Sequence, residues 1–298
     1  MSKPTKARRD LHQEVTDKIL ALMESGQLPW EKPWKRGQNR ADGLLPYNAV
    51  SRNNYSGINL ALLWATSGDY TNNQWVTFKQ AIDLGGNVKK GEKGTGIVFF
   101  KPWKVEDKKT GEDKYIPLLK PYTVFNIDQC EGLTLPDLKP VEPPEDPRGA
   151  VLEIANANSV NLEHGGDRAC FIPSRDRVQM PHFQNFKSEQ HYSATLAHEL
   201  THWTGHKDRL NRDLSGMFGC EKYAKEELIA EMGSAFLMAE LGLEYEARHH
   251  AAYLQSWIKG LKEDKKFIFQ AAAAASKATA LLQGRSKTEE KPEEEKAA

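Results

Sequence analysis

The chain has 298 residues, of which 39% are hydrophobic and 28% charged, and it is long enough for two domains, each with its own core. It contains no apolar run that could span a bilayer, and the N-terminus MSKPTKARRD lacks an apolar signal segment, so we expect a cytoplasmic protein with no membrane partner. The three cysteines lack Cys-x-x-Cys spacing, which argues against a disulfide framework and against a thiolate zinc site.

The formal net charge of zero conceals an asymmetry between the two halves. Residues 1–128 carry 20 Lys and Arg against 14 Asp and Glu, whereas the remainder carries 21 against 27. A modestly basic first half is compatible with a nucleic-acid partner.

The first half has the pattern of an α+β domain, which we place at residues 1–135. It predicts an amphipathic helix at 8–25, then a Trp-rich loop. Short helices at 58–65 and 77–84 and strands at 96–105 and 115–127 follow, the strands being joined by a turn at 108–111.

A segment with five prolines, residues 136–149, predicts a stiff linker between the domains. The second domain, residues 150–284, is predicted to be mainly helical with a small sheet. Its expected helices lie at 150–156, 188–205, 223–241, 247–262 and 267–282, and its expected short strands at 169–173 and 177–180. The charged tail, residues 285–298, is expected to be disordered.

The stretch ATLAHELTHWTGH, residues 194–206, contains the H-E-x-x-H arrangement of zinc peptidases. On a helix capped by Ser188 and ended at Gly205, residues four apart share one face, so His198 and His202 can bind one ion. Glu199 lies beside them, within reach of a water molecule at the metal, and is the candidate general base. The strand at 177–180 is our candidate edge strand for an extended substrate.

Three acidic residues are candidates for the third ligand of the metal. Glu227 and Glu231 are one turn apart on the next helix, and we favour Glu227 as the ligand, with Glu231 orienting a ligating imidazole. Glu226 is expected to face solvent. Asp208 is the alternative, since it would complete H-E-x-x-H-x-x-G-x-x-D.

The basic and aromatic residues of the first half are typical of single-stranded DNA binding, in which bases stack on rings and cations contact phosphates. Trp30 and Trp34 lie between prolines and are the candidate base platforms, with Lys35 and Arg36 beside them. A glycine-flanked turn supplies the other candidate cations, Lys89, Lys90 and Lys93.

Several stretches taken together resemble one family: LPWEKPW, PYNAVSRNNYSGIN, WVTFKQAIDLGGNVKKGEKGTGIVFF, YSATLAHELTHWTGH and YAKEELIAEMGSAFL. The chain resembles the ArdC-type antirestriction proteins of conjugative plasmids and the N-terminal part of TraC-type plasmid primases, over roughly residues 11–280. The resemblance implies a single-stranded DNA-binding N-terminal domain, a zincin-like C-terminal metallopeptidase domain, and protection of incoming DNA from host restriction.

The same resemblance implies metal binding by His198 and His202, catalysis by Glu199, and a third ligand from the helix of Glu227 and Glu231. In thermolysin-like peptidases an acidic residue four positions after the ligand Glu orients a histidine, which matches this pair. The chain lacks the Asn that usually precedes that ligand.

Three functions follow from these observations as hypotheses. The first is a DNA-binding metallopeptidase that uses a divalent ion, with zinc as the expected one, and acts on a host restriction-associated protein. The alternative is a DNA-binding protector whose metal site is structural or vestigial. A third and weaker hypothesis makes the ion a nuclease cofactor.

Overall fold

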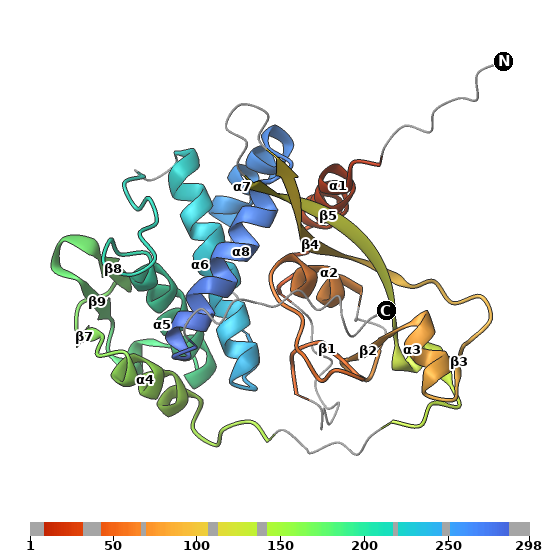
Figure 1. The fold of residues 1–298 in the computed structure, drawn as a ribbon. Helices are drawn as coiled ribbons and strands as arrows, with labels where there is room; N and C mark the ends of the chain where they lie inside the picture. Colours follow the sequence, from red (N-terminus) through yellow and green to blue (C-terminus); the bar gives the residue numbers. More distant parts are fainter. Residues whose placement is uncertain are drawn as a thin grey trace.

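The computed structural model describes residues 9–31, 43–66, 70–106, 113–135, 142–216, 220–245 and 251–285 (Figure 1). The helices and strands of the N-terminal half are α1 (Leu11–Glu24), β1 (Tyr47–Asn48), α2 (Ile58–Thr66), β2 (Gln74–Thr77), α3 (Phe78–Asp83), β3 (Asn87–Val88), β4 (Thr95–Glu106), β5 (Asp113–Asn126) and β6 (Cys130–Glu131). Those of the C-terminal half are α4 (Pro147–Ala157), β7 (Asn161–His164), β8 (Cys170–Ile172), β9 (Arg177–Met180), α5 (Glu189–Thr204), α6 (Glu221–Glu240), α7 (Ala251–Glu263) and α8 (Phe267–Leu282).

The predicted α+β fold class is confirmed. The predicted helices at 58–65, 77–84 and 267–282 correspond to α2, α3 and α8, and the long strands correspond to β4 and β5. The turn predicted at 108–111 lies outside the described residues, as does most of the charged tail.

Local sequence signals explain where several helices begin. The carboxylate of Asp10 accepts a hydrogen bond from Gln13 N at 3.2 Å and so caps α1. Thr77 and Gln80 form a capping box at the start of α3. Asp146 caps α4, which therefore begins at Pro147, inside the segment predicted to be a linker.

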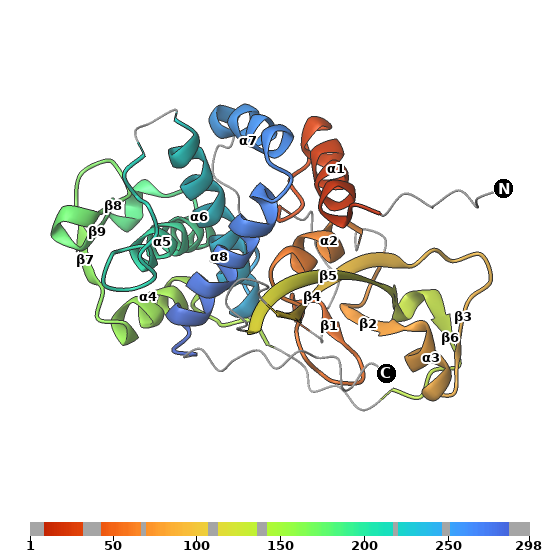
Figure 2. The ribbon, with the colours of Figure 1, turned by 45° about the horizontal axis from the view of Figure 1, so that its top comes forward.

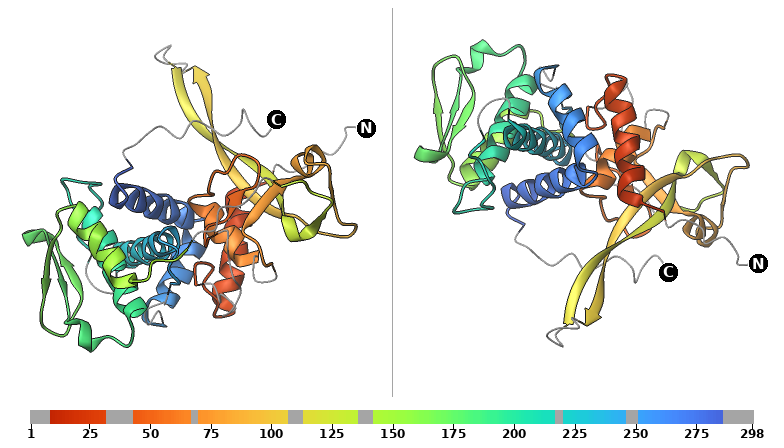
Figure 3. Two further views of the ribbon diagram at one scale, coloured as in Figure 1. Left: turned by 90° about the horizontal axis from the view of Figure 1, so that it is seen from below. Right: turned by 90° about the horizontal axis from the view of Figure 1, so that it is seen from above.

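The N-terminal half is built on a four-stranded sheet in the order β1-β2-β5-β4. The strand β4 pairs with β5 along its whole length, from Thr95↔Val124 to Glu106↔Asp113. This long hairpin extends away from the helices of the C-terminal half (Figure 3). A two-stranded ribbon, β3-β6, lies with α3 at the other end of the sheet (Figure 2).

The C-terminal half packs α5, α6 and α8 together beside a three-stranded sheet in the order β7-β9-β8. The strand β9 pairs with β7 on one side and with β8 on the other. The prediction that residues 177–180 form the edge strand was wrong, because the sequence pattern did not reveal β7. The antiparallel edge of this sheet is β8.

The two halves are joined by a shared hydrophobic cluster, and each half also has a cluster of its own. One hydrophobic cluster runs from α1 and α2 into α6, α7 and α8. Trp64 of α2 packs on Phe236 of α6 with ring centroids 5.7 Å apart, and Thr16 Oγ1 of α1 donates to Lys265 O. None of the described helices is long and apolar enough to cross a membrane.

Candidate metal centre

The helix α5 carries the H-E-x-x-H motif, and its ends are the predicted ones. Ser188 Oγ accepts a hydrogen bond from His191 N at 3.0 Å, and Gly205 follows the last helical residue. The helical repeat then places His198 and His202 one turn apart on a single face. That face lies against α6, the helix that carries Glu227.

Close packing sets the distance between α5 and α6. Gly233 of α6 lies so near Thr201 that a Cβ at position 233 would be 2.5 Å from Thr201 Cγ2. Two turns toward the start of α5, Ser234 Oγ donates to Ala194 O at 2.8 Å. A glycine at this crossing therefore lets the carboxylates of α6 reach the histidines of α5.

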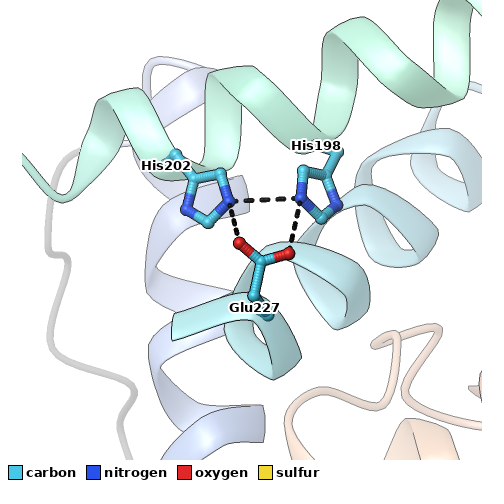
Figure 4. A group of neighbouring side chains, drawn as sticks. All are labelled: His198, His202 and Glu227. Atoms are coloured by element: carbon cyan, nitrogen blue, oxygen red, sulfur yellow. Dashed lines mark hydrogen bonds and ion pairs between the residues drawn. The ribbon is translucent and has the colours of Figure 1, made fainter. Parts of the chain in front are cut away.

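Three side chains converge in the space between the two helices (Figure 4). The Nε2 atoms of His198 and His202 are 3.1 Å apart. The two carboxylate oxygens of Glu227 lie 3.6 Å from His198 Nε2 and 3.4 Å from His202 Nε2. Ligand atoms about 2.1 Å from a tetrahedral zinc ion are roughly 3.4 Å from one another, so this spacing fits a divalent ion.

The outer nitrogen of each imidazole faces a second carboxylate. His198 Nδ1 is 3.4 Å from Glu231 Oε2, and His202 Nδ1 is 3.1 Å from Glu226 Oε1. These partners favour a proton on each Nδ1 and so leave both Nε2 lone pairs directed at the same point. Two lone pairs and a carboxylate repel one another in a buried space unless a cation lies between them, which is the chemical requirement that a metal ion meets.

Without a metal ion, a proton supplies this positive charge. Burial by itself lowers the pKa of His202, but the carboxylates of Glu226 and Glu227 outweigh it and raise that pKa to about 10. The pKa of Glu227 lies below its usual value, because His198 and His202 outweigh the effect of its burial. A metal ion must therefore displace a proton from His202, which makes binding depend on pH.

Glu226 is not the solvent-facing residue that the sequence suggested. It is buried and forms a bidentate ion pair with Arg212, with its two oxygens 2.8 and 3.0 Å from the guanidinium nitrogens. Arg212 also donates to Thr201 O and Thr204 Oγ1 of α5. Glu226 thus occupies the position at which thermolysin-like peptidases usually have an Asn. Its carboxylate contacts both His202 and Arg212, the latter from the loop that follows α5.

The candidate general base Glu199 is buried next to the two histidines. Its Oε2 accepts a hydrogen bond from Phe171 N of β8 at 3.0 Å. The edge strand β8 therefore runs beside Glu199, on the side of α5 where a substrate backbone could pair with it.

The alternative ligand Asp208 lies away from this group. It is exposed and lies 3.4 Å from His206 Nδ1, in a different cavity of about 730 Å³ at the end of α5. Glu231, the other alternative, faces Nδ1 of His198 rather than the point at which the Nε2 atoms converge. The geometry thus favours Glu227 as the third ligand and Glu231 as the residue that orients His198.

The candidate DNA-binding residues divide into three groups. Trp30 is 2% exposed and packs edge-on against Trp257 of α7, so the prediction that it is a base platform was wrong. Residues 34–36, which include Trp34, Lys35 and Arg36, lie outside the described residues. Lys89, Lys90 and Lys93 are exposed on the turn between β3 and β4.

An exposed aromatic residue near this turn was not identified from the sequence. Phe78, the first residue of α3, is 58% exposed, and Ile82 one turn later is 46% exposed. The pair has the spacing of a core-facing helix, so its sequence pattern predicts burial rather than exposure.

Comparison with known proteins agrees with the division of the chain into an N-terminal and a C-terminal half. The family model described as the N-terminal domain of anti-restriction factor ArdC matches residues 9–125. A model described as a zincin-like metallopeptidase matches residues 150–274.

Two related proteins match this chain over most of its length. A protein named DNA primase TraC from Escherichia coli is 39% identical over 91% of this chain, which spans only 27% of that primase. The uncharacterized protein y4eC of Sinorhizobium fredii (strain NBRC 101917 / NGR234) is 37% identical over 89% of both chains.

Two crystal structures of the antirestriction protein ArdC from plasmid R388 are similar over almost their whole length. The metal-free structure is 43% identical, with a TM-score of 0.78, over 93% of this chain and 98% of that one. The Mn(II)-bound structure is 40% identical, with a TM-score of 0.76, over 95% and 100% of the two chains. Since sequence, fold and both family models agree, the chain belongs to the ArdC family of antirestriction proteins.

Proposed function

We propose that this protein binds single-stranded DNA through its N-terminal half and hydrolyses peptide bonds at a divalent metal ion held in its C-terminal half by His198, His202 and Glu227. The observation that carries the proposal is the convergence of two imidazole nitrogens and a carboxylate beside Glu199. A purely structural site does not require a carboxylate base next to its ligands.

The residues around the ion have separate roles in this proposal. A divalent ion bound here supplies Lewis-acid chemistry, which polarises a carbonyl group and acidifies water. Glu199 accepts the proton of the attacking water and passes it to the leaving amine. Glu231 and Glu226 keep the two imidazoles oriented, and β8 offers backbone groups to an extended peptide.

We assign zinc as the ion, because two histidines and one glutamate are a common ligand set of catalytic zinc. The Mn(II)-bound structure of the R388 protein supports a divalent ion in this family. Metal analysis of purified protein, loaded in turn with zinc and manganese, tests the assignment.

The DNA-binding surface is proposed at the end of the N-terminal half where α3 and the β3–β4 turn meet (Figure 2). Lys89, Lys90 and Lys93 supply exposed cations there for phosphates, and Phe78 supplies an exposed ring for a base. Gly91 has a φ of +94°, and its left-handed conformation forms the turn that presents the lysines.

The biological role proposed for this protein follows its family. The R388 relative is named an antirestriction protein, which supports protection of incoming plasmid DNA from host restriction during conjugation. The partners are then single-stranded DNA and, as peptidase substrate, a host restriction-associated protein, both of which are met in the cytoplasm.

The test compares Glu199→Ala with wild type in three assays: metal content, single-stranded DNA affinity and hydrolysis of an unfolded protein such as casein. Only hydrolysis should be lost, because the substitution removes the proton acceptor and no ligand. Retained hydrolysis would refute the role of Glu199. Protection of DNA in a conjugation assay then shows whether peptide hydrolysis contributes to antirestriction.

One observation favours the alternative of a protector with a structural metal site. His198, Glu199 and Glu227 are all buried, as expected for an ion that joins α5 to α6. In that case metal removal should lower the melting temperature, while the wild-type protein should hydrolyse no peptide at any metal content.

A further inference from the structure

A second cavity adjoins the metal centre, on the side of α5 nearer to its N-terminus. It has a volume of about 340 Å³, which is enough for one long side chain. Its polar lining residues are Asp167, Asn185, His191 and Thr195. Ala169, Pro181 and Phe186 form its apolar walls.

Two of the segments that line this cavity also lie next to Glu199. Thr195 and His191 lie one and two helical turns before Glu199 on α5, and so share its face of the helix. On the opposite wall, Ala169 is followed by β8, whose Phe171 N donates to Glu199 Oε2. A peptide lying along β8 would therefore place a side chain in the cavity.

One residue that lines the cavity has a buried hydroxyl group with no hydrogen-bond partner in the described part of the chain. Thr195 is 2% exposed, and its Oγ1 has no hydrogen-bond partner among the residues that the structure describes. An unsatisfied buried hydroxyl destabilises the folded protein, because its lost hydrogen bond to water is not replaced. A ligand that brings a polar group to Thr195 would remove this cost, whereas a purely apolar one would not.

The charge of the cavity indicates which polar group it suits. Asp167 is the one acidic residue among the described residues that line the cavity, and it is exposed. Within the part of the chain that the structure describes, no lysine or arginine lines the cavity. A cationic side chain would thus meet a carboxylate at Asp167 and hydrogen-bonding groups on Asn185 and Thr195.

From this lining we infer that the cavity is a substrate subsite that selects a lysine or arginine side chain next to the bond to be cleaved. The inference rests on the proposed function, since it requires a peptide held at the metal centre. It adds a specificity that the metal ligands and Glu199 do not define.

The test uses two hydroxamates that differ in one group: one carries the side chain of lysine next to the chelating group, and the other that of norleucine. Isothermal titration of the zinc-loaded full chain should give at least tenfold tighter binding of the lysine compound. Asp167→Asn and Thr195→Val should each reduce this preference severalfold. Glu153→Gln is the matched control, because it removes an exposed carboxylate on α4 that does not line the cavity.

Asp167→Lys provides a variant that is independent of buried packing, since residue 167 is exposed. It should reverse the preference, so that a glutamate-derived hydroxamate binds more tightly than the lysine one. Equal affinity of wild type for the lysine and norleucine compounds would overturn the inference and leave the proposed function standing. Failure of both compounds to bind protein that retains its zinc would overturn the inference and the proposed peptidase function together.

Discussion

Gly233→Ala tests whether the contact between α5 and α6 sets the metal geometry. The new Cβ would be 2.5 Å from Thr201 Cγ2 and 2.8 Å from Thr201 Oγ1. Thr201 cannot easily turn away, because it is fully buried and its hydroxyl donates to Ala197 O at 2.9 Å. Carbon atoms prefer separations of about 3.5–4.0 Å, so the helices must move apart by roughly 1 Å at this point.

The substitution is expected to lower both the stability of the protein and its affinity for the metal. Such overpacking costs about 1–3 kcal/mol of folding free energy. Metal ligands tolerate only about 0.2 Å of displacement, and Glu227 moves with α6 while the two histidines stay on α5. We therefore expect metal affinity to fall at least tenfold, equivalent to about 1.4 kcal/mol.

Competition with a chromogenic chelator measures the metal affinity, and chemical denaturation of the metal-free protein measures stability. The double variant Gly233→Ala with Thr201→Ala should regain most of the metal affinity, because both atoms nearest to the new Cβ are gone. Metal affinity within threefold of wild type in Gly233→Ala would refute the claim that this contact positions Glu227.

Four further predictions concern the ligands, the second carboxylate, pH and the DNA surface. Metal analysis should show loss of the ion in His198→Ala and Glu227→Gln. Binding should be weakened in Glu231→Gln and unchanged in Asp208→Asn. Full metal occupancy of Glu227→Gln would contradict the ligand assignment. Glu226→Gln leaves Arg212 buried without its ion pair, so denaturation should show a loss of about 3–5 kcal/mol, against little change for the exposed Glu221→Gln on the same helix. The pKa of His202 is raised to about 10 in the metal-free fold. Protonation of His202 therefore contributes its full stabilisation of the fold below the unfolded pKa of about 6.5, and this stabilisation is lost as the pH rises through 10. Calorimetry should therefore show that the difference in melting temperature between metal-loaded and metal-free protein increases from pH 7 to 10; a constant difference would argue against proton displacement from His202. Replacing Lys89, Lys90 and Lys93 should make the affinity for single-stranded DNA depend less steeply on salt. Phe78→Ala should instead lower the affinity at every salt concentration and leave the steepness of the salt dependence unchanged. Unchanged binding in both variants would locate the DNA surface elsewhere.

The sequence by itself determined the features that depend on neighbouring residues. The caps Ser188 and Gly205 define α5, and the helical repeat then fixes His198 and His202 on one face. The β4–β5 hairpin and α8 follow in the same way from local patterns. These elements were predicted because hydrogen bonds within a helix or between adjacent strands select them.

Burial and exposure in the N-terminal half were decided by tertiary contacts. Trp30, in a loop rich in prolines and basic residues, is covered by α7 more than 200 positions later in the chain. Phe78 has the spacing of a buried residue but lies at an end of the sheet, where it contacts Phe125 of β5 and stays 58% exposed. Neither outcome is contained in a local pattern, because each depends on which distant element packs there.

The position of the candidate third ligand was likewise decided by the packing of two helices. The sequence offered Glu227, Glu231 and Asp208, all of which are acidic and none of which has a fixed distance from His202. Gly233 lets α6 approach α5 closely, and this approach brings Glu227 to the two Nε2 atoms and Glu231 to the outer nitrogen of His198. The choice of ligand follows from the relative position of two rigid helices, which only the folded chain defines.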